Sequence, residues 1–391
     1  MTVRMNIVYM LVLSALLSLG PAFAVAQEPT SLEYPYLYKS TRAMGMGGAY
    51  TAVGGRVDTL FYNPAGLSNI PQDKGWEVNL LNISAEESKN VQSFADDMRD
   101  ALNSTNDNGS SSVDQLQAVN KVLDNYRGQE LHARVADFTS IGKNYDRFAF
   151  GVGALASGQV DAIPHQGMGS DGLLEVDANA TYGGIGGFSY GMTQNLTAGL
   201  TIKALHRESL IHDFTAEELV DNQNNLSDYI KHSLMRTGDA IGFDAGLIWK
   251  FAPQSSIKPS FGLSVLNIGG LDFGAAGTIP QTVNIGVAIN PTISEFRSLT
   301  VAMDYVDVLN NFTQDKDMAK RLRYGAELQL FDVWPAEMAL RAGMYEGYPT
   351  LGVDLRLLIF MFSYSMYTEE IGAYAGQDKN KRQLLTVDIG W

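Results

Sequence analysis

Residues 41–68 read TRAMGMGGAYTAVGGRVDTLFYNPAGLS, a stretch that suits neither a long helix nor an exposed loop. Glycine tolerates close backbone contact and backbone angles that other residues resist. Pro64 favours an extended Asn63 and can open a short helix at Ala65. A compact apolar coil of this kind needs walls around it, and we expect the rest of the chain to form them. The glycines of the stretch are Gly45, Gly47, Gly48, Gly54 and Gly55.

The composition excludes several classes of protein. The absence of cysteine excludes disulfides, thiolate metal sites and cysteine nucleophiles. A formal net charge of -15 argues against a nucleic-acid partner, because phosphate binding requires clustered Lys and Arg. The five histidines form no HxxxH or HxH pair, so we predict neither a metal nor a cofactor. With 39 glycines and 10% aromatic residues, the composition favours β-structure.

Residues 1–26 have the pattern of a secretory signal peptide. Arg4 precedes an apolar run at residues 7–19, and the following AFAVA at residues 22–26 fits a small-x-small cleavage site. The pattern predicts export and a mature chain that starts at Val25 or Gln27. Further along the sequence, no stretch approaches the ~18 apolar residues of a membrane-spanning helix, whereas spanning by β-strands stays open.

From residue 75 onward, the chain repeats segments of about ten residues in which apolar positions alternate with polar or glycine positions, as in membrane strands. In the last segment, Leu385, Val387 and Ile389 share one face with the final residue, Trp391. We count about fourteen segments, and an even number places both chain ends in the periplasm. The pattern predicts an all-β fold, a 14-stranded antiparallel transmembrane barrel over residues 75–391. The segments begin near residues 75, 130, 146, 173, 195, 239, 257, 282, 298, 321, 336, 350, 359 and 382.

The connections alternate in length, as in barrels that have short periplasmic turns and longer external loops. Apolar spacing of three and four predicts helices within residues 90–102, 113–126 and 215–234, the last with a capping box of Thr215 and Glu218. We expect these helices to form external lids. The expected long joins are 88–128, 159–172, 208–238, 267–280, 310–320 and 367–381. The expected short joins are 143–145, 192–195, 253–256, 290–295 and 332–335, with 345–348 as an exception.

The segments RAMGMGGAYTAVGG and VDTLFYNPAGLS, together with the alternating strands, resemble the FadL family of outer-membrane transporters for long-chain fatty acids and other hydrophobic compounds. They also resemble the wider PorV-type and TraF-like barrels. The resemblance implies a barrel closed by an N-terminal hatch at residues 27–74, with the five glycines, Asn63, Pro64 and Ala65 as hatch or gate residues. It also implies a bacterial outer-membrane location, a ligand pocket against the hatch and a lateral opening between strands.

Candidate ligand contacts come from the coil and from the inward strand faces. They are the aromatic Phe61 and Tyr62 and the basic Lys203, Arg207 and Arg323. The cationic pocket of the family does not map onto this chain residue by residue, and inward acids such as Asp244 could instead pair with these bases. The glycine coil could also be a fixed plug. Val387, Ile389 and Trp391 resemble the C-terminal signal that the barrel assembly machinery reads.

The function expected from these features is passive transport of hydrophobic compounds, such as long-chain fatty acids or hydrocarbons, through the outer membrane and its lipid. An alternative is a PorV-like accessory barrel that docks or shuttles protein partners in a secretion or surface-attachment system. A general diffusion porin conflicts with a hatch. We expect no enzymatic activity, because no HExxH occurs and the histidines lack a neighbouring nucleophile motif.

Overall fold

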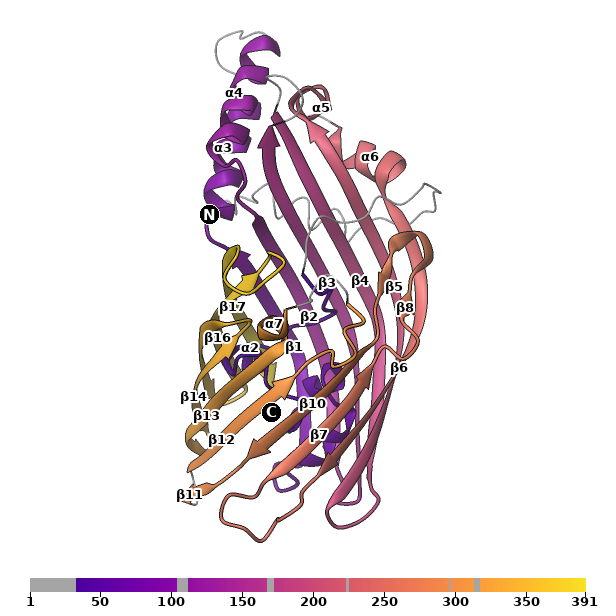
Figure 1. Ribbon diagram of the computed structural model, residues 1–391, viewed down its shortest axis with the longest axis vertical. Coiled ribbons are helices and arrows are strands. Elements are labelled where there is room, and N and C mark those ends of the chain that lie inside the picture. Colours follow the sequence, from indigo (N-terminus) through magenta and orange to yellow (C-terminus); the bar gives the residue numbers. More distant parts are fainter. Residues whose placement is uncertain (1–32, 104–111, 167–171, 223–224, 295–296, 313–316) are drawn as a thin grey trace.

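The computed structural model describes residues 33–103, 112–166, 172–222, 225–294, 297–312 and 317–391. The signal peptide expected at residues 1–26 lies outside them. The chain forms a closed antiparallel barrel of 14 strands (Figure 1), in which the first strand, β1 (Trp76–Ser88), pairs with the last, β17 (Lys379–Gly390). Among the described residues, no helix is long and apolar enough to cross a membrane.

The other barrel strands follow in chain order and pair with their neighbours. They are β2 (Leu131–Asn144), β3 (Phe148–Gln166), β4 (Gly172–Gly191), β5 (Leu196–Thr215), β6 (Arg236–Trp249), β7 (Ser260–Leu266), β10 (Thr282–Ile289), β12 (Arg297–Tyr305), β13 (Leu322–Val333), β14 (Ala336–Tyr345), β15 (Tyr348–Leu357) and β16 (Phe360–Glu370). Short pieces lie in the connections: β8 (Leu271–Asp272), η4 (Gly274–Ala276), β9 (Thr278–Ile279), β11 (Thr292–Ser294) and α7 (Met318–Arg321). Each barrel strand begins within three residues of its predicted start.

Side chains alternate between the lumen and the outer surface along each strand. On β5, Thr201 and Lys203 are buried inside, whereas Leu200 and Ile202 are exposed outside. Large apolar side chains such as Ile241 are exposed on the outer face of other strands. An apolar outer face around a polar interior is the arrangement of a bilayer-embedded barrel. The fold is therefore of the bacterial outer-membrane type.

The barrel wall is much higher on one side, over β2 to β6, and this side is termed the tall wall below. Strands β3, β4 and β5 contain 19, 20 and 20 residues, whereas β7 and β10 contain 7 and 8. At about 3.3 Å per residue, the tall strands are roughly 40 Å longer than the short ones. The expectation that residues 159–166 and 208–215 are loops was wrong, because both segments continue the ladders of β3 to β5 upward (Figure 1).

The expected helices are present as α3 (Val91–Asn103), α4 (Ser112–Asn125), α5 (Ala216–Asp221), α6 (Leu226–Tyr229) and the π-helical turn η3 (Ile230–Leu234). Thr215 Oγ1 accepts the Glu218 N–H at 3.0 Å, the predicted cap. The expectation of lids was wrong, because Phe94 of α3 and Leu123 of α4 pack with Leu131 of β2. Leu131 faces outward, since the next residue, His132, points inward to Glu86. These helices therefore cover the outward apolar face of the tall wall (Figure 1).

Residues 33–75, termed the N-terminal segment below, lie inside the barrel. The segment contains α2 (Thr41–Gly45) and two 3-10 turns, η1 (Val57–Phe61) and η2 (Pro64–Asn69). Leu60 packs with Phe138 and Ile185 of the wall, and Tyr50 packs near Ala302 on the other side. The segment therefore contacts the inner wall on both sides. Below, the end of the barrel with the tall strands and long loops is termed extracellular, and the end with the short turns is termed periplasmic.

Candidate functional site: the N-terminal segment and its two cavities

Asn63 attaches the N-terminal segment to the wall. Its backbone is extended, with φ -159° and ψ 107°, and its Oδ1 accepts the Ala65 N–H at 3.1 Å, as Pro64 led us to expect. Its Nδ2 donates to the carbonyl of Thr51 at 2.7 Å and to that of Leu247 on β6 at 3.2 Å. One amide side chain therefore joins two turns of the segment to a barrel strand.

Two glycines of the barrel wall lie opposite the Asn63-Pro64-Ala65 turn, where wall and turn come closest. A Cβ at Gly246 would lie 1.9 Å from Asn63 Oδ1, and one at Gly199 would lie 2.4 Å from the Ala65 nitrogen. Both distances are too short for any side chain. The Asn-Pro-Ala turn is therefore seated directly on the backbone of β5 and β6.

The five glycines of the segment do not all have the same role. Gly47 and Gly54 have φ of 66° and 59°, and a Cβ on either would lie within 2.5 Å of backbone atoms. Left-handed angles together with such contacts require glycine. Gly48 and Gly55 also have positive φ, whereas Gly45 instead faces the backbone of Gly352 at close range.

Buried ion pairs connect the segment to β13, β14 and β15. Arg42 donates to both carboxylate oxygens of Glu327, at 2.8 and 2.7 Å. Arg341 donates to Glu327 at 2.6 Å and to both oxygens of Asp354, and Arg56 reaches Asp354 at 3.0 Å. Burial lowers the pKa of Arg42, but the Glu327 carboxylate raises it well above its ordinary value. The chain of pairs therefore remains charged.

A second set of ion pairs lies nearer the extracellular side. Lys39 Nζ lies 2.7 Å from Glu33 and 2.8 Å from Glu369, and Arg382 lies 2.7 Å from the other Glu33 oxygen. Burial raises the pKa of Glu33, but Arg382 and Lys39 outweigh this effect and lower it below its ordinary value. The start and the middle of the segment are therefore fixed to the wall by neutralised charges.

The extracellular cavity is small, about 70 Å³, and aromatic. Its rings come from Tyr34, Tyr36, Tyr38, Phe61, Tyr62, Phe312 and Tyr345. The bases that line it are paired with acids: Lys203 donates to Asp244 at 2.9 Å, and Arg323 donates to Glu346 at 2.9 Å. The rings therefore give the cavity apolar surfaces, and the paired acids neutralise the charges of Lys203 and Arg323.

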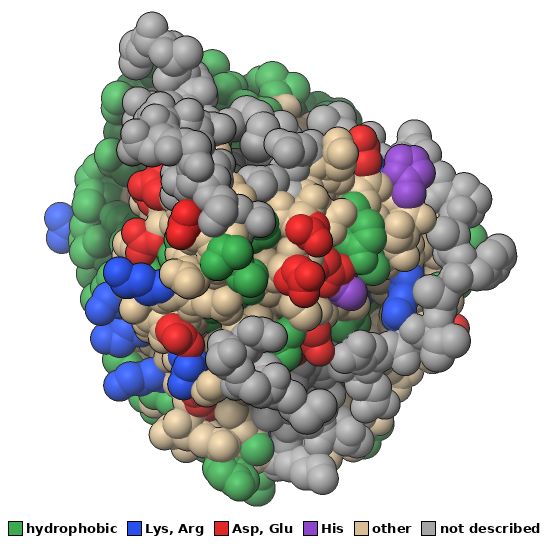
Figure 2. Space-filling view, turned by 90° about the horizontal axis from the view of Figure 1, so that it is seen from above, with side chains coloured by type: hydrophobic (Ala, Val, Ile, Leu, Met, Phe, Trp, Pro, Cys, Tyr) green, Lys and Arg blue, Asp and Glu red, His purple; other side chains and the backbone are tan. Residues whose placement is uncertain are grey.

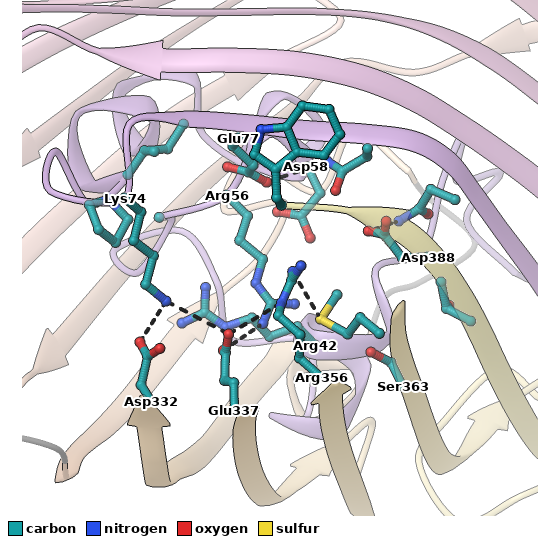
Figure 3. Close-up of a pocket in the computed structure, with 18 of the residues that line it drawn as sticks. Arg42, Arg56, Asp58, Lys74, Glu77, Asp332, Glu337, Arg356, Ser363 and Asp388 are labelled. Atoms are coloured by element: carbon teal, nitrogen blue, oxygen red, sulfur yellow. Dashed lines mark hydrogen bonds and ion pairs between the residues drawn. The ribbon is translucent and has the colours of Figure 1, made fainter. Parts of the chain in front are cut away.

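The periplasmic cavity is about 750 Å³ and is lined by both charged and apolar side chains, the latter including Trp76, Trp334 and Trp391. Figure 3 shows basic and acidic side chains converging on it from the segment and the wall. Lys74 bonds to Asp332 at 2.6 Å, and Arg356 lies 3.5 Å from Glu337. Sequence reasoning did not anticipate this cavity. Its other charged lining residues are Arg42, Arg56, Asp58, Glu77, Glu327 and Asp388.

Comparison with known proteins identifies the fold of this barrel. No family model and no curated protein matches the sequence. The toluene transporter TbuX of Ralstonia pickettii matches with a TM-score of 0.50 and 12% identity, over 90% of this chain and 98% of that one. The toluene transporter TodX of P. putida matches at 0.46 and 11% (89% and 97% covered), and a Pseudomonas aeruginosa FadL homologue at 0.37 and 12% (89% and 97%). The chain has the fold of FadL-type outer-membrane transporters.

At such low identity, the likeness to TbuX shows the FadL-type fold alone. It agrees with the fold and the membrane location expected from the sequence. The ladders from β2 to β6 run without a register break, whereas β1 shifts register after Asn79 beside both β2 and β17. The lateral opening implied by the resemblance stays a prediction.

Within the FadL-type fold, the two cavities share one lining residue, Tyr38. Its ring stacks on Phe61 at 4.9 Å, and Phe61 meets Phe138 edge-on at 4.8 Å. The Tyr38 hydroxyl donates to Asn82 Oδ1 on β1 at 2.9 Å. Phe61 belongs to the extracellular lining and Phe138 to the periplasmic one, so these three rings separate the cavities.

The structure places the five candidate ligand contacts as follows. Phe61, Tyr62, Lys203 and Arg323 all line the extracellular cavity. Arg207 does not line it and lies against the ring of Phe273, 5.7 Å from its centre. Sequence reasoning missed Tyr34, Tyr36 and Tyr38, although three tyrosines at every second position could have indicated a lining strand-like run.

Two other motifs have clear positions. GFSYG at residues 187–191, which sequence reasoning passed over, matches the GxSxG pattern of serine hydrolases, but Ser189 lies within β4 and not on a strand-to-helix turn. Val387 and Ile389 lie on β17, and the Trp391 N–H and carbonyl bond to Val78 on β1 at 2.9 and 2.8 Å. The last residue therefore helps to close the barrel, and its role as an assembly signal stays a prediction.

Proposed function

We propose that the protein passes small, neutral, hydrophobic solutes of the aromatic hydrocarbon type passively across the outer membrane, with the N-terminal segment as its hatch. One observation carries the proposal: the extracellular cavity is lined by aromatic rings, and the bases beside it are paired with acids. Aromatic faces and edges attract other aromatic molecules with little need for charge.

The pairing of the bases argues against a fatty-acid carboxylate as the preferred solute. Lys203 is held by Asp244 and also donates to Asn267 at 2.8 Å, and Arg323 is held by Glu346. To bind a carboxylate, either base would have to leave its acid. That acid would then be a buried, uncompensated charge, which costs about 3–5 kcal/mol.

The proposed route follows the two cavities. A solute enters from the extracellular mouth, rests among the rings, passes Tyr38 and Phe61 when the segment moves, and leaves through the charged periplasmic cavity. The large cavity favours release, because a small solute in about 750 Å³ makes few close contacts with the walls. The concentration gradient is sufficient to drive this movement.

Uptake by bacteria with and without the protein tests the proposal. We expect faster entry of labelled toluene, and no faster entry of benzoate, which has a similar ring and a carboxylate. Tyr38→Ala, which removes the shared ring, should change the toluene rate, whereas Lys121→Ala on α4 should not. Equal gains for toluene and benzoate would overturn the choice of substrate class. A stoichiometric protein partner in mild membrane extracts, with no gain in uptake, would instead support the docking alternative.

A further inference from the structure

Three potential metal ligands meet on the inner face of the tall wall, above the hatch. They are His165 on β3, Glu175 on β4 and Asp213 on β5, and their ligand atoms all lie within 4.8 Å of one another. Glu175 and Asp213 stand directly opposite each other across the β4–β5 ladder. Figure 2 shows acidic side chains and a histidine gathered at this extracellular end of the molecule.

The polar groups of this triad are poorly satisfied. Carboxylates directly opposite each other on a sheet repel. Within the described residues, the Asp213 carboxylate has no hydrogen bond or ion pair, and the ion-pair neighbour of Glu175 is His165 at 3.8 Å. The His165 Nε2 atom is buried and has no hydrogen-bond partner there. Two unneutralised carboxylates and an open imidazole nitrogen therefore face a common point.

A second group of potential ligands serves as an internal contrast. Glu33, His132 and Asp161 also bring their ligand atoms within 4.8 Å. There, Lys39 and Arg382 each lie 2.7 Å from one Glu33 oxygen. These fixed cations already provide the charge that a metal ion would bring, so this group carries no metal proposal.

We propose that His165, Glu175 and Asp213 bind a divalent transition metal of the Zn²⁺ type at the extracellular mouth. One imidazole nitrogen and two carboxylates suit zinc, whereas Ca²⁺ prefers oxygen ligands alone. Zinc needs ligand atoms at about 2.0–2.2 Å, which rotation of these side chains can supply, with water in the fourth position. The ion would cancel the repulsion across β4 and β5 and tie three tall strands together.

Titration calorimetry with ZnCl₂ and with CaCl₂ tests the site, using tag-free full-length protein in detergent. We expect one Zn²⁺ per chain and no heat from Ca²⁺. His165→Ala and Asp213→Asn should each weaken Zn²⁺ binding at least tenfold, a loss of about 1.4 kcal/mol. The matched control is His206→Ala, because His206 pairs with only one acid, Asp239, at 2.8 Å.

Both possible failures are informative. Wild-type protein that binds no Zn²⁺ overturns the proposal, and so does Zn²⁺ binding that both His165→Ala and Asp213→Asn leave unchanged. Thermal unfolding of each variant without metal checks that the barrel is intact, and the conservative Asp213→Asn keeps the test valid if His165→Ala misfolds. Zinc should raise the unfolding temperature of wild-type protein and of His206→Ala, but not that of the other two variants. None of these outcomes depends on toluene uptake.

Discussion

The two cavities on either side of the N-terminal segment differ in size and in chemistry. The extracellular cavity is about 70 Å³ and lined largely by rings, and the periplasmic cavity is about 750 Å³ and lined by charged side chains together with apolar ones such as Trp76 and Trp391. A small apolar space discriminates by shape, because every unfilled or overfilled volume costs packing energy. A space of about 750 Å³ fits no single small solute closely. Under the proposed function, the difference predicts that selection occurs on the extracellular side of the N-terminal segment and release on the periplasmic side.

The two cavities stay separate only while the N-terminal segment stays in place. Replacing Arg341 should disturb that arrangement most. Its side chain is fully buried between Glu327 and Asp354. Arg341→Met leaves two buried carboxylates short of a partner, so we expect a loss of about 3–5 kcal/mol of stability. Thermal unfolding should show the loss, and planar-bilayer recordings should show an aqueous current that the wild-type protein lacks.

The control for this variant is Arg356→Met. Arg356 is mostly buried, lies 3.5 Å from Glu337 and donates to the Gly390 carbonyl at 3.0 Å, so its removal should cost less than that of Arg341, about 1–2 kcal/mol. A closed, fully stable Arg341→Met protein would show that the ion pairs do not hold the segment, and the division into two cavities would then need another cause.

Filling each cavity in turn sharpens the comparison. Thr282 lines the extracellular cavity and Ser298 lines the periplasmic one. Thr282→Trp should fill the small space and reduce toluene uptake about tenfold or more, equivalent to about 1.4 kcal/mol. Ser298→Trp should change uptake less than about twofold, because a side chain occupies little of the larger volume. The reverse order would place selection on the periplasmic side.

A pH titration tests the ion pairs of Glu33 with Lys39 and Arg382, which lie nearer the extracellular side. Arg382 and Lys39 hold the pKa of Glu33 below its ordinary value of 4.5 in the folded protein, against the effect of burial. Its ionised form therefore contributes stability that is present above pH 4.5 and is lost as the pH falls below it. We expect the unfolding temperature of wild-type protein to fall between pH 5 and pH 3.

Glu33→Gln is the matched variant for this titration. It should be less stable than wild-type protein at pH 7, because it leaves Lys39 and Arg382 with one acid fewer. The difference between the two proteins should shrink as the pH falls toward 3. A constant difference would mean that the Glu33 carboxylate contributes nothing through its charge.

The sequence predicted the barrel better than it predicted the site, for physical reasons. Alternation along a strand is a local property, so the segment ending in Leu385, Val387 and Ile389 could be recognised without its neighbours. Which base meets which acid depends on the stagger between strands far apart in the chain, so the pairs of Arg341 were not predictable. The upper parts of β3 and β5 were missed because their outward residues, such as Val160 and Leu210, pack under helices and not against lipid.

The smallest effect should come from the exposed charge at the periplasmic opening. Lys74 and Asp332 form a 2.6 Å ion pair with side chains 48% and 38% exposed. Exposed pairs contribute about 0–1 kcal/mol, so Lys74→Met should leave stability and toluene uptake nearly unchanged. Uptake rates of wild-type and variant cells, measured side by side, provide the test. A large change in rate would mean that charge in the periplasmic cavity selects the solute, and the contrast between the two cavities would fail at that point.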